Sequence, residues 1–364
     1  MRFRVLLSAL PAVLAVLSAA TVRAAGFHVP GYELVYSYPV ETTLSEPDLR
    51  RALDVWPEMF NRAKKTIDIE EFYITPSTDP GEALEPSLKA LERAAKRGVR
   101  IRVLLEKKFE KNSLDGIARL KSIPGLDLRI IDWAGINGDG IVHAKFFIVD
   151  STRAFVGSQN FDWRALKHIH ELGLAIADGP VVRQVQSVFD HDWSVAAATT
   201  PAAPVQTERP APDRAQRAYL VASPWRLNPP GVGDSESELV RLLEEATGQV
   251  QIQLLDYSPL TRGKSRRFYS VLDNALRDAS VRGVKVKLLV SHWNTDEPHI
   301  RHLQSLAVLP NVEIRIAAIP ESKDGPIPFS RVIHSKYLVV DGKTLWLGTS
   351  NWGGGYLTAS RNLE

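Results

Sequence analysis

Residues 143–160 read HAKFFIVDSTRAFVGSQN, and residues 334–351 read HSKYLVVDGKTLWLGTSN. In both stretches His, Lys, Asp, Gly and Asn follow the same pattern, His-x-Lys-x4-Asp-x6-Gly-x2-Asn. Each copy holds two short apolar runs separated by a polar turn, which is typical of a β-hairpin. The repeat therefore predicts that the chain contains two copies of one structural unit.

The polar residues of the two hairpins are suited to a single site. Side chains alternate along a strand, so His143 and Lys145 should share one face, as should His334 and Lys336. If the hairpins face each other, two imidazoles, two ammonium groups and two carboxamides converge. Imidazoles titrate near neutral pH, and ammonium groups neutralise phosphoryl oxygens. The pattern therefore predicts a site for a phosphodiester.

The remaining sequence indicates an α/β protein that arose by duplication. Residues 96–105 and 281–289 both read as the end of a helix, a glycine and a buried strand. Each half should therefore be a mixed sheet covered by helices. Besides the two hairpins, we expect strands at 66–74, 99–106, 126–132, 171–177, 250–257, 284–291 and 312–318, and helices at 83–97, 115–122, 181–193, 237–246, 268–282 and 298–306.

The chain divides at a segment rich in proline and alanine. Its first residues combine arginines, a short apolar run and small residues, which is the pattern of a secretory signal peptide that is cut after Ala24. The predicted parts are a signal peptide (1–24), a first half (25–198), a linker (199–216) and a second half (217–364).

The second half ends early by comparison with the first. Glu171 opens a strand that leads into a closing helix, whereas Glu364 falls at nearly the equivalent place and is the last residue. We expect the second half to lack its last strand and helix, because the sequence is truncated or because one sheet position is unfilled.

Composition limits the compartment and the chemistry. The chain has no cysteine, which excludes disulfides, thiolate metal sites and a cysteine nucleophile. With the leader removed, basic and acidic side chains are equal in number. Binding of a phosphate polymer would therefore need a local patch of basic residues. We expect an exported protein, periplasmic or secreted, with no metal, no cofactor and no obligate protein partner.

At the paired motifs the sequence resembles the phospholipase D superfamily. It is most similar to the phospholipase-D-like lysosomal branch, some of whose members are 5′ exonucleases on single strands, and it reads as a bacterial exported homologue. The branch resemblance is carried by GSQNFDWRAL (157–166), ELG (171–173), SHW (291–293), EP (297–298) and GTSNW (348–352). The resemblance implies a duplicated mixed-sheet fold in which two halves pack as a pseudodimer around one active site. It also implies a two-step reaction through a phosphohistidine, with retention at phosphorus.

The resemblance and the residue types together assign roles. By analogy, His143 is the nucleophile and His334 is the general acid and base. Lys145 and Lys336 should neutralise the non-bridging phosphoryl oxygens. We expect the substrate-binding groups to be Asn160, Asn351, Ser158 and Ser350.

Carboxylates are expected to support these groups. Glu171 is a candidate for orienting one imidazole, and Glu364 is a candidate for the same part in the other half. Asp150 and Asp341 should be structural, because they fall at the hairpin turns, where they can accept backbone N–H bonds. Four aromatic residues are further candidates for the pocket or the core: Tyr73, Tyr257, Trp163 and Trp352.

These features predict a phosphoric diester hydrolase of the phospholipase D type, able in principle to transfer the phosphatidyl group to an alcohol. Neutral overall charge favours a phospholipid head group as the substrate, with transient contact to a membrane surface. One alternative is a nuclease or 5′ exonuclease on single-stranded nucleic acid, for which a loop run provides basic residues (Arg262, Lys264, Arg266 and Arg267). Another is a non-catalytic scaffold that binds phosphate or lipid.

Overall fold

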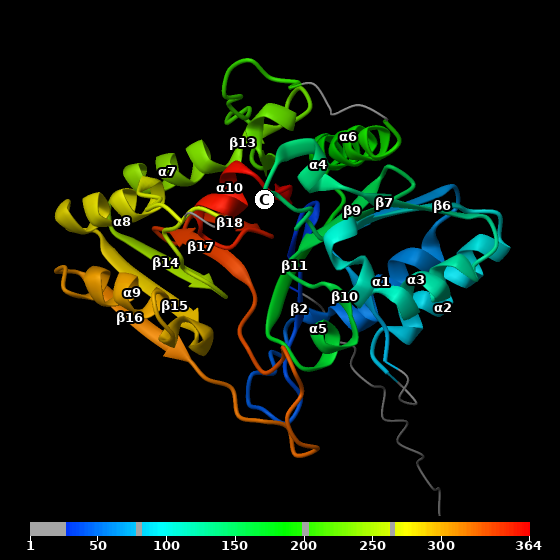
Figure 1. The fold of residues 1–364 in the computed structure, drawn as a ribbon, viewed down its shortest axis with the longest axis horizontal. Coiled ribbons are helices and arrows are strands. Elements are labelled where there is room, and N and C mark those ends of the chain that lie inside the picture. Colours follow the sequence, from blue (N-terminus) through cyan, green and yellow to red (C-terminus); the bar gives the residue numbers. More distant parts are fainter. Residues whose placement is uncertain (1–26, 78–81, 199–203, 263–265) are drawn as a thin grey trace, which may run out of the picture.

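A computed structural model describes residues 27–77, 82–198, 204–262 and 266–364. The predicted signal peptide (1–24) and Lys264 lie outside these ranges. Within them, no helix has the length and apolar character needed to cross a membrane. Figure 1 shows two lobes side by side, with the C-terminus between them.

The first half is built on a large mixed sheet with the strand order β1-β2-β11-β9-β8-β4-β6-β7 and with β3 beside β2. Strands β4, β6 and β7 are parallel, whereas β8, β9 and β11 pair antiparallel. A small parallel pair, β5 with β10, lies beyond β4. The bounds are β1 (His28–Val29), β2 (Tyr32–Ser37), β3 (Arg50–Arg51), β4 (Thr66–Glu71), β5 (Ile74–Thr75), β6 (Arg100–Glu106), β7 (Leu126–Ile131), β8 (Phe146–Val149), β9 (Arg153–Gly157), β10 (Phe161–Asp162) and β11 (Glu171–Ile176).

Helices cover both faces of this sheet. Buried residues of α1, α2 and α3 join one apolar cluster with strand residues such as Ile69 and Phe147. Buried residues of α6 join a second cluster with Phe146 and Ile148, whose side chains alternate to the opposite face. The bounds are α1 (Ala52–Arg62), α2 (Glu85–Lys96), η1 (Lys107–Asn112), α3 (Leu114–Lys121), α4 (Trp133–Asn137), α5 (Trp163–Lys167) and α6 (Gly179–Ala196).

The second half has a five-stranded sheet in the order β16-β15-β14-β17-β18, with its apolar cluster on the face covered by α7, α8 and α9. A small sheet, β13-β12-β19, lies at the joint between the halves. The bounds are β12 (Val221–Ser223), η2 (Trp225–Leu227), β13 (Gly233–Asp234), α7 (Ser235–Glu245), β14 (Gln249–Leu254), α8 (Val271–Val281), β15 (Lys285–Ser291), η3 (His292–Thr295), α9 (His299–Ala307), β16 (Val312–Ala317), β17 (Lys336–Val340), β18 (Thr344–Gly348), α10 (Gly354–Thr358) and β19 (Asn362–Leu363).

Two glycines show why the repeated helix–glycine–strand segments fold alike. Gly98 and Gly283 follow α2 and α8 with φ of +84° and +91°, the left-handed region in which a helix commonly ends at glycine. Arg97 and Arg282 precede them, and each donates a guanidinium hydrogen bond to the carbonyl of a neighbouring helical segment. The repeat therefore sets the direction in which each chain enters β6 and β15.

The predicted elements are confirmed with shifts of a few residues at their ends. One detail is corrected: His143 and Lys145 precede β8 rather than lie within it, although Lys336 does open β17. Residues 362–363 form β19, which pairs with β12 and does not join the five-stranded sheet. The described part of the predicted linker, 204–216, forms neither helix nor strand.

The halves meet through two parallel bridges that place equivalent residues symmetrically. Val142 pairs with Arg361, and His170 pairs with Ile333. Position 361 corresponds to 170, and 333 to 142, under the same numerical shift that relates His334 to His143. The two halves are therefore related by an approximate two-fold axis that passes between the two motifs.

Candidate active site

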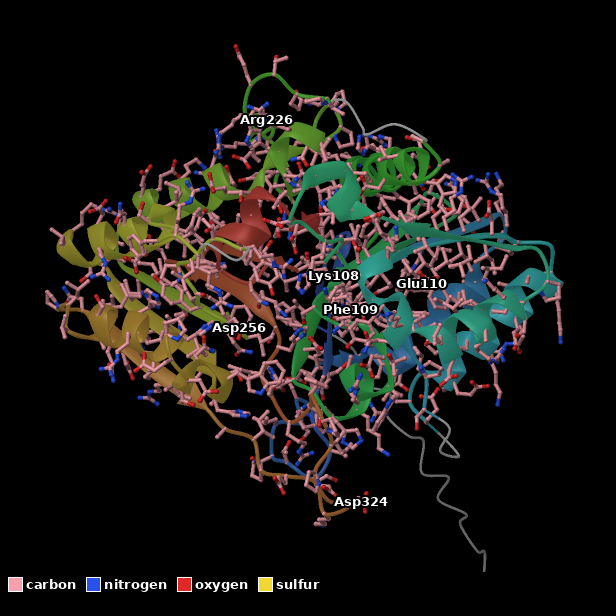
Figure 2. All side chains as sticks on the ribbon, viewed as in Figure 1. Lys108, Phe109, Glu110, Arg226, Asp256 and Asp324 are labelled. Atoms are coloured by element: carbon pink, nitrogen blue, oxygen red, sulfur yellow. The ribbon has the colours of Figure 1, made fainter. Side chains whose placement is uncertain are left out.

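A cavity of about 580 Å³ opens at this joint, and both motif histidines line it. In Figure 2 Lys108 and Phe109 lie on the first-half side of the joint and Asp256 on the second-half side. The lining residues of the first half are Phe72, Tyr73, Thr75, Lys108, Phe109, Asn112, Ile141, His143, Asn160, Arg164 and Ile169. Those of the second half are Leu255, Asp256, Arg262, Trp293, Phe329, Val332, His334, Asn351 and Tyr356.

The His143 ring is held by a neutral amide from the other half. Its Nδ1 lies 3.0 Å from Oδ1 of Asn362, and that oxygen also accepts a hydrogen bond of 3.0 Å from the Thr349 hydroxyl. The rings of Phe72 and Tyr356 lie 5.2 Å and 4.9 Å from the imidazole, centroid to centroid. Because Nδ1 is engaged, the ring nitrogen that His143 can offer to a ligand is Nε2.

The His334 ring is held by a carboxylate in the symmetric position. Its Nδ1 lies 2.7 Å from Oε2 of Glu171, which also accepts a hydrogen bond of 2.5 Å from the Ser158 hydroxyl. Burial raises the pKa of Glu171 to about 8, against the opposing effect of nearby ammonium groups, the first of which is Lys336. Each half thus orients the imidazole of the other half, but one partner is ionisable and the other is neutral.

The two motif lysines are fully buried, and Nζ of each donates to the carbonyl oxygen of the histidine in its own motif. Burial and the second ammonium group lower the pKa of Lys145 well below its usual value. Burial lowers the pKa of Lys336 to about 7, although Glu171 and Asp256 oppose the shift. The pKa values of both histidines are also well below the usual value, first because of burial and then because of the lysines. Proton binding to this cluster is therefore costly unless an anion is present.

Asn160 and Asn351 line the cavity at matching positions. Oδ1 of each is buried without a hydrogen-bond partner among the described residues. Ser158 and Ser350 do not line it, which corrects their predicted contact with substrate. Their hydroxyls point to carboxylates instead, that of Ser158 to Glu171 and that of Ser350 to Glu364.

The predicted orienting role of Glu364 is also corrected. Its carboxylate accepts hydrogen bonds from the hydroxyls of Ser350 and Ser235 and contacts neither imidazole. The residue that holds His143 is Asn362, two positions earlier. The motif shift from His143 to His334, applied to Glu171, leads to position 362. This constant shift is the sequence signal that identifies Asn362.

Asp150 and Asp341 lie at the far ends of the hairpins, away from the cavity. Asp150 accepts hydrogen bonds from the backbone N–H groups of Lys64, Lys65 and Thr66, which lead into β4. Asp341 makes the equivalent bonds to residues 247–249, which lead into β14. Each therefore joins its hairpin turn to the start of the neighbouring strand.

Of the predicted aromatic candidates, only Tyr73 lines the cavity. Tyr257 and Trp352 are buried in the second-half core, and Trp163 packs beside the first-half core. Of the basic run, Arg262 lines the cavity, whereas Arg266 and Arg267 do not. Sequence reasoning missed several lining groups, among them Phe72, Lys108, Phe109, Arg164, Asp256, Trp293 and Tyr356. In the described ranges, no three His, Asp or Glu side chains are grouped so that they could hold a metal ion.

Comparison with known proteins places the chain in a family. A family model described as Cardiolipin synthase, PLD-like domain, matches residues 57–193 and 239–364. Phospholipase D Z of Dictyostelium discoideum is 33% identical over 342 residues, which cover 85% of this chain and 79% of that protein. The 5'-3' exonuclease PLD3 of Xenopus tropicalis is 32% identical over 83% of this chain and 67% of that protein.

A solved structure shows the same fold at low sequence identity. The phosphatidylserine synthase of Haemophilus influenzae Rd KW20 superposes with a TM-score of 0.59 and 12% identity over 85% of this chain and 78% of that chain. The predicted duplicated mixed-sheet fold and the likeness to the exonuclease branch are thus both confirmed. The family match spans both halves, each with its own copy of the motif, and the chain belongs to the phospholipase D superfamily.

Proposed function

We propose that the protein is a phosphoric diester hydrolase that works through a phosphohistidine. The observation that carries this proposal is that two histidines line one cavity, each held at Nδ1 by a side chain of the opposite half. Such support fixes the tautomer and directs Nε2 to the ligand. One imidazole can then attack phosphorus while the other protonates the leaving oxygen, and the second imidazole later activates water.

The different partners of the two rings support a division of labour. A nucleophile must start neutral, and Asn362 offers His143 an acceptor without a full charge. A general acid must start protonated, and Glu171 is an ionisable group that can share a proton with His334, whereas the Asn362 amide cannot do this for His143. We therefore assign His143 as the nucleophile and His334 as the acid and base.

The two buried lysines, which hydrogen-bond to the lining histidines and are not themselves among the lining residues, support an anionic ligand. Burial lowers the pKa values of Lys145 and Lys336, so the empty site holds their positive charges poorly. A phosphodiester would supply the missing negative charge, and its non-bridging oxygens would gain the ammonium groups as partners. Asn160 and Asn351 add neutral amide groups at the cavity wall.

The neutral overall charge of the chain favoured a phospholipid head group as the substrate. The residues that line the cavity favour instead the end of a single-stranded nucleic acid. The rings of Phe72 and Phe109 lie 4.0 Å apart, centroid to centroid, beside Tyr73, and Lys108 lines the same cavity. Arg262 lies across the cavity with its guanidinium over the Tyr356 ring. Aromatic rings next to cations are suited to stacked bases and backbone phosphates. The name of the PLD3 relative points the same way.

The first experiment tests the chemistry without assuming a natural substrate. Full-length protein is mixed with bis-p-nitrophenyl phosphate in EDTA, beside the variants His143→Ala and His334→Ala. We expect turnover by the wild type and losses of several orders of magnitude in both variants. A folded wild type that does not hydrolyse the diester would support the binding scaffold instead.

A second experiment separates the substrate classes. Phosphatidylcholine vesicles and a single-stranded oligonucleotide with a free 5′ hydroxyl are offered side by side at several salt concentrations. We expect trimming of the oligonucleotide that weakens as salt rises, since phosphate contacts release counterions. Hydrolysis of phosphatidylcholine in the vesicles, with no trimming of the oligonucleotide, would show that the substrate is a phospholipid instead.

Two further proposals rest on the sequence alone. The proposal that the protein is exported is supported by the leader pattern at residues 1–24. The division into halves at 199–216 follows from the Pro/Ala-rich composition there.

A further inference from the structure

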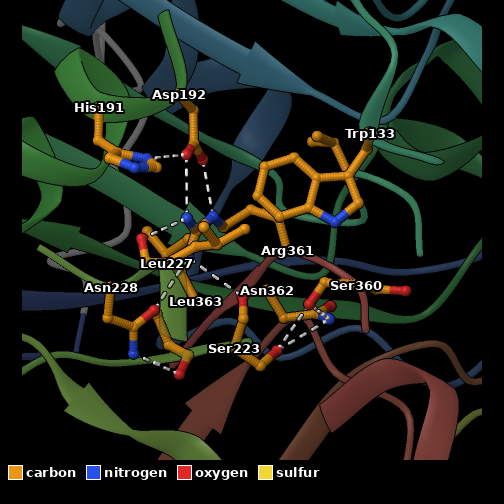
Figure 3. Close-up of polar contacts among 12 residues, drawn as sticks. Trp133, His191, Asp192, Ser223, Leu227, Asn228, Ser360, Arg361, Asn362 and Leu363 are labelled. Carbon is orange, nitrogen blue, oxygen red and sulfur yellow. Dashed lines mark hydrogen bonds and ion pairs between the residues drawn. The ribbon is translucent and has the colours of Figure 1, made fainter. Parts of the chain in front are cut away.

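Arg361 is fully buried at the joint between the halves, and every N–H of its guanidinium is engaged. Nε and Nη2 bind the two oxygens of Asp192 on α6 at 2.7 Å and 2.9 Å. The remaining donors reach Asn228 Oδ1 at 2.9 Å and the carbonyls of Leu227 and Ser223 at 2.9 Å and 3.2 Å. Figure 3 shows the guanidinium enclosed by these groups. Five bonds in a fixed plane specify the position of Arg361 much more narrowly than apolar packing would.

The charges in this cluster balance without solvent. Although burial opposes ionisation of Asp192, the adjacent Arg361 lowers the pKa of this carboxyl below its usual value. Burial and the Asp192 charge raise the pKa of the neighbouring Glu70 well above its usual value. The two shifts therefore favour a negative charge on Asp192 rather than on Glu70 beside the guanidinium. The indole of Trp133 covers the guanidinium at 4.9 Å.

The backbone of Arg361 is bonded directly to the segment that carries His143. Its N–H donates to the carbonyl of Ile141, and its carbonyl accepts from the N–H of His143, both at 2.9 Å. The next residue, Asn362, presents Oδ1 to the ring of the same histidine. The anchored residue, Arg361, is thus the immediate neighbour in sequence of Asn362, the residue that holds the His143 ring.

We propose that Arg361, locked to Asp192, is a positioning residue that holds Asn362 against His143. The symmetric position in the other half supports a specialised role. There His170 makes the same backbone contact to His334, but within the described ranges its side chain forms no ion pair and hydrogen-bonds to Gln253 and Ser335. Of these two bridging residues, Arg361 and His170, only Arg361 is therefore anchored by an arginine–carboxylate ion pair among the described residues.

This arrangement cannot be reproduced by lysine. Arg361→Lys keeps a positive charge beside Asp192, so the buried carboxylate is not left without a charged partner. The substitution removes the planar guanidinium that donates to Ser223, Leu227 and Asn228. Segment 360–362 then gains freedom at the place where the His143 ring is held.

The inference rests on the proposed function, and the test has a readout that does not need it. Wild-type and Arg361→Lys full-length proteins are labelled with ¹⁵N-histidine, and long-range ¹H–¹⁵N spectra report the tautomer of each ring. The His143 signals are assigned from their loss in His143→Gln. Turnover of bis-p-nitrophenyl phosphate and the thermal midpoint are measured on the same samples.

We expect Arg361→Lys to lose the uniform Nδ1–H tautomer at His143. We also expect kcat to fall about 10–100-fold, the usual loss when an orienting group is removed, with KM unchanged within about twofold. Arg102→Lys is the matched control, because Arg102 forms a similar ion pair with Asp68 over the rings of Phe189 and Trp193, without a link to His143. It should lower the thermal midpoint and leave kcat and the His143 tautomer as they are.

A folded Arg361→Lys with wild-type kcat and tautomer would overturn the inference, as would an equal loss of kcat in Arg102→Lys. If no protein hydrolyses the diester but the tautomer changes in Arg361→Lys alone, positioning stands and the hydrolase proposal falls. Should Arg361→Lys not fold, Asp192→Asn carries the same expectation, because it removes the charged acceptor and keeps the side chain's shape.

Discussion

Glu171→Gln removes an ionisable carboxyl group beside His334 and keeps the size of the side chain. Glu171 is fully buried, and its Oε2 lies 2.7 Å from Nδ1 of the imidazole, so the substitution replaces an acceptor that can carry a negative charge with one that cannot. A hydrogen bond to a charged group contributes about 1.5–3 kcal/mol. At about 1.4 kcal/mol per tenfold, this corresponds to a loss of about 10–150-fold in the step that needs protonated His334.

The sign of the pH effect follows from the same contact. Glu171 can take the negative charge that stabilises the imidazolium and Gln cannot, so the substitution lowers the pKa of His334. The general acid then loses its proton at lower pH, and the alkaline limb of the kcat/KM profile should move down by about one to two pH units. The acid limb, which we assign to His143, should stay in place.

The matched variant in the other half is Asn362→Asp, which places a carboxylate on His143. This change should raise the pKa of His143, so the acid limb should move up while the alkaline limb stays. Both profiles are measured as kcat/KM for the single-stranded oligonucleotide with a free 5′ hydroxyl, whose alkoxide leaving group needs a proton, between pH 4 and pH 10, with folding checked by circular dichroism at each end. An unchanged alkaline limb in Glu171→Gln, or movement of the same limb in both variants, would refute the division of roles.

Two more predictions concern the lysines and the hairpin turns. Tungstate mimics the phosphoryl oxygens and should bind the protonated form of Lys336, whose pKa is about 7. Inhibition by tungstate should therefore weaken by about tenfold for each pH unit above 7. An inhibition constant that does not change between pH 7 and pH 9 would count against this prediction. Asp150→Ala should lower the free energy of unfolding by about 1–3 kcal/mol, since three backbone N–H groups lose an acceptor, while kcat stays as it is. Although partial burial of Asp150 opposes the shift, those bonds lower the pKa of its carboxyl group. The stabilisation should therefore be present above pH about 3.9 and lost in stronger acid. A large loss of kcat in Asp150→Ala would show instead that Asp150 takes part in the reaction.

The sequence predicted the parts of the fold that depend on local pattern. The hairpins at residues 143–160 and 334–351 follow from alternation and turn residues, and the helix–glycine–strand units follow from Gly98 and Gly283. Among the elements that were not predicted are strand β2 and helix α1, early in the first half. Strand β2 pairs with β11, a neighbour distant in sequence, and α1 carries a proline in its interior.

Within the site, the sequence predicted the groups whose type and spacing are repeated, and it missed those at which the two halves differ. Asn362 corresponds to Glu171, yet an amide and a carboxylate do not resemble each other in a pattern search. Arg361 and Asp192 are distant in sequence and meet only because the last residues pass between the halves. Such contacts depend on how the halves pack, which no local pattern contains.

The central claim is that His143 carries the phosphoryl group, and one measurement tests it directly. p-Nitrophenolate leaves without protonation, so His334→Ala should still be phosphorylated by bis-p-nitrophenyl phosphate but should hydrolyse the adduct slowly. We predict a burst of one p-nitrophenol per protein in His334→Ala, with an acid-labile adduct that mass spectrometry locates on the peptide containing His143, and no burst in His143→Ala. An adduct on the His334 peptide, or turnover by the wild type with no adduct in either variant, would contradict the account.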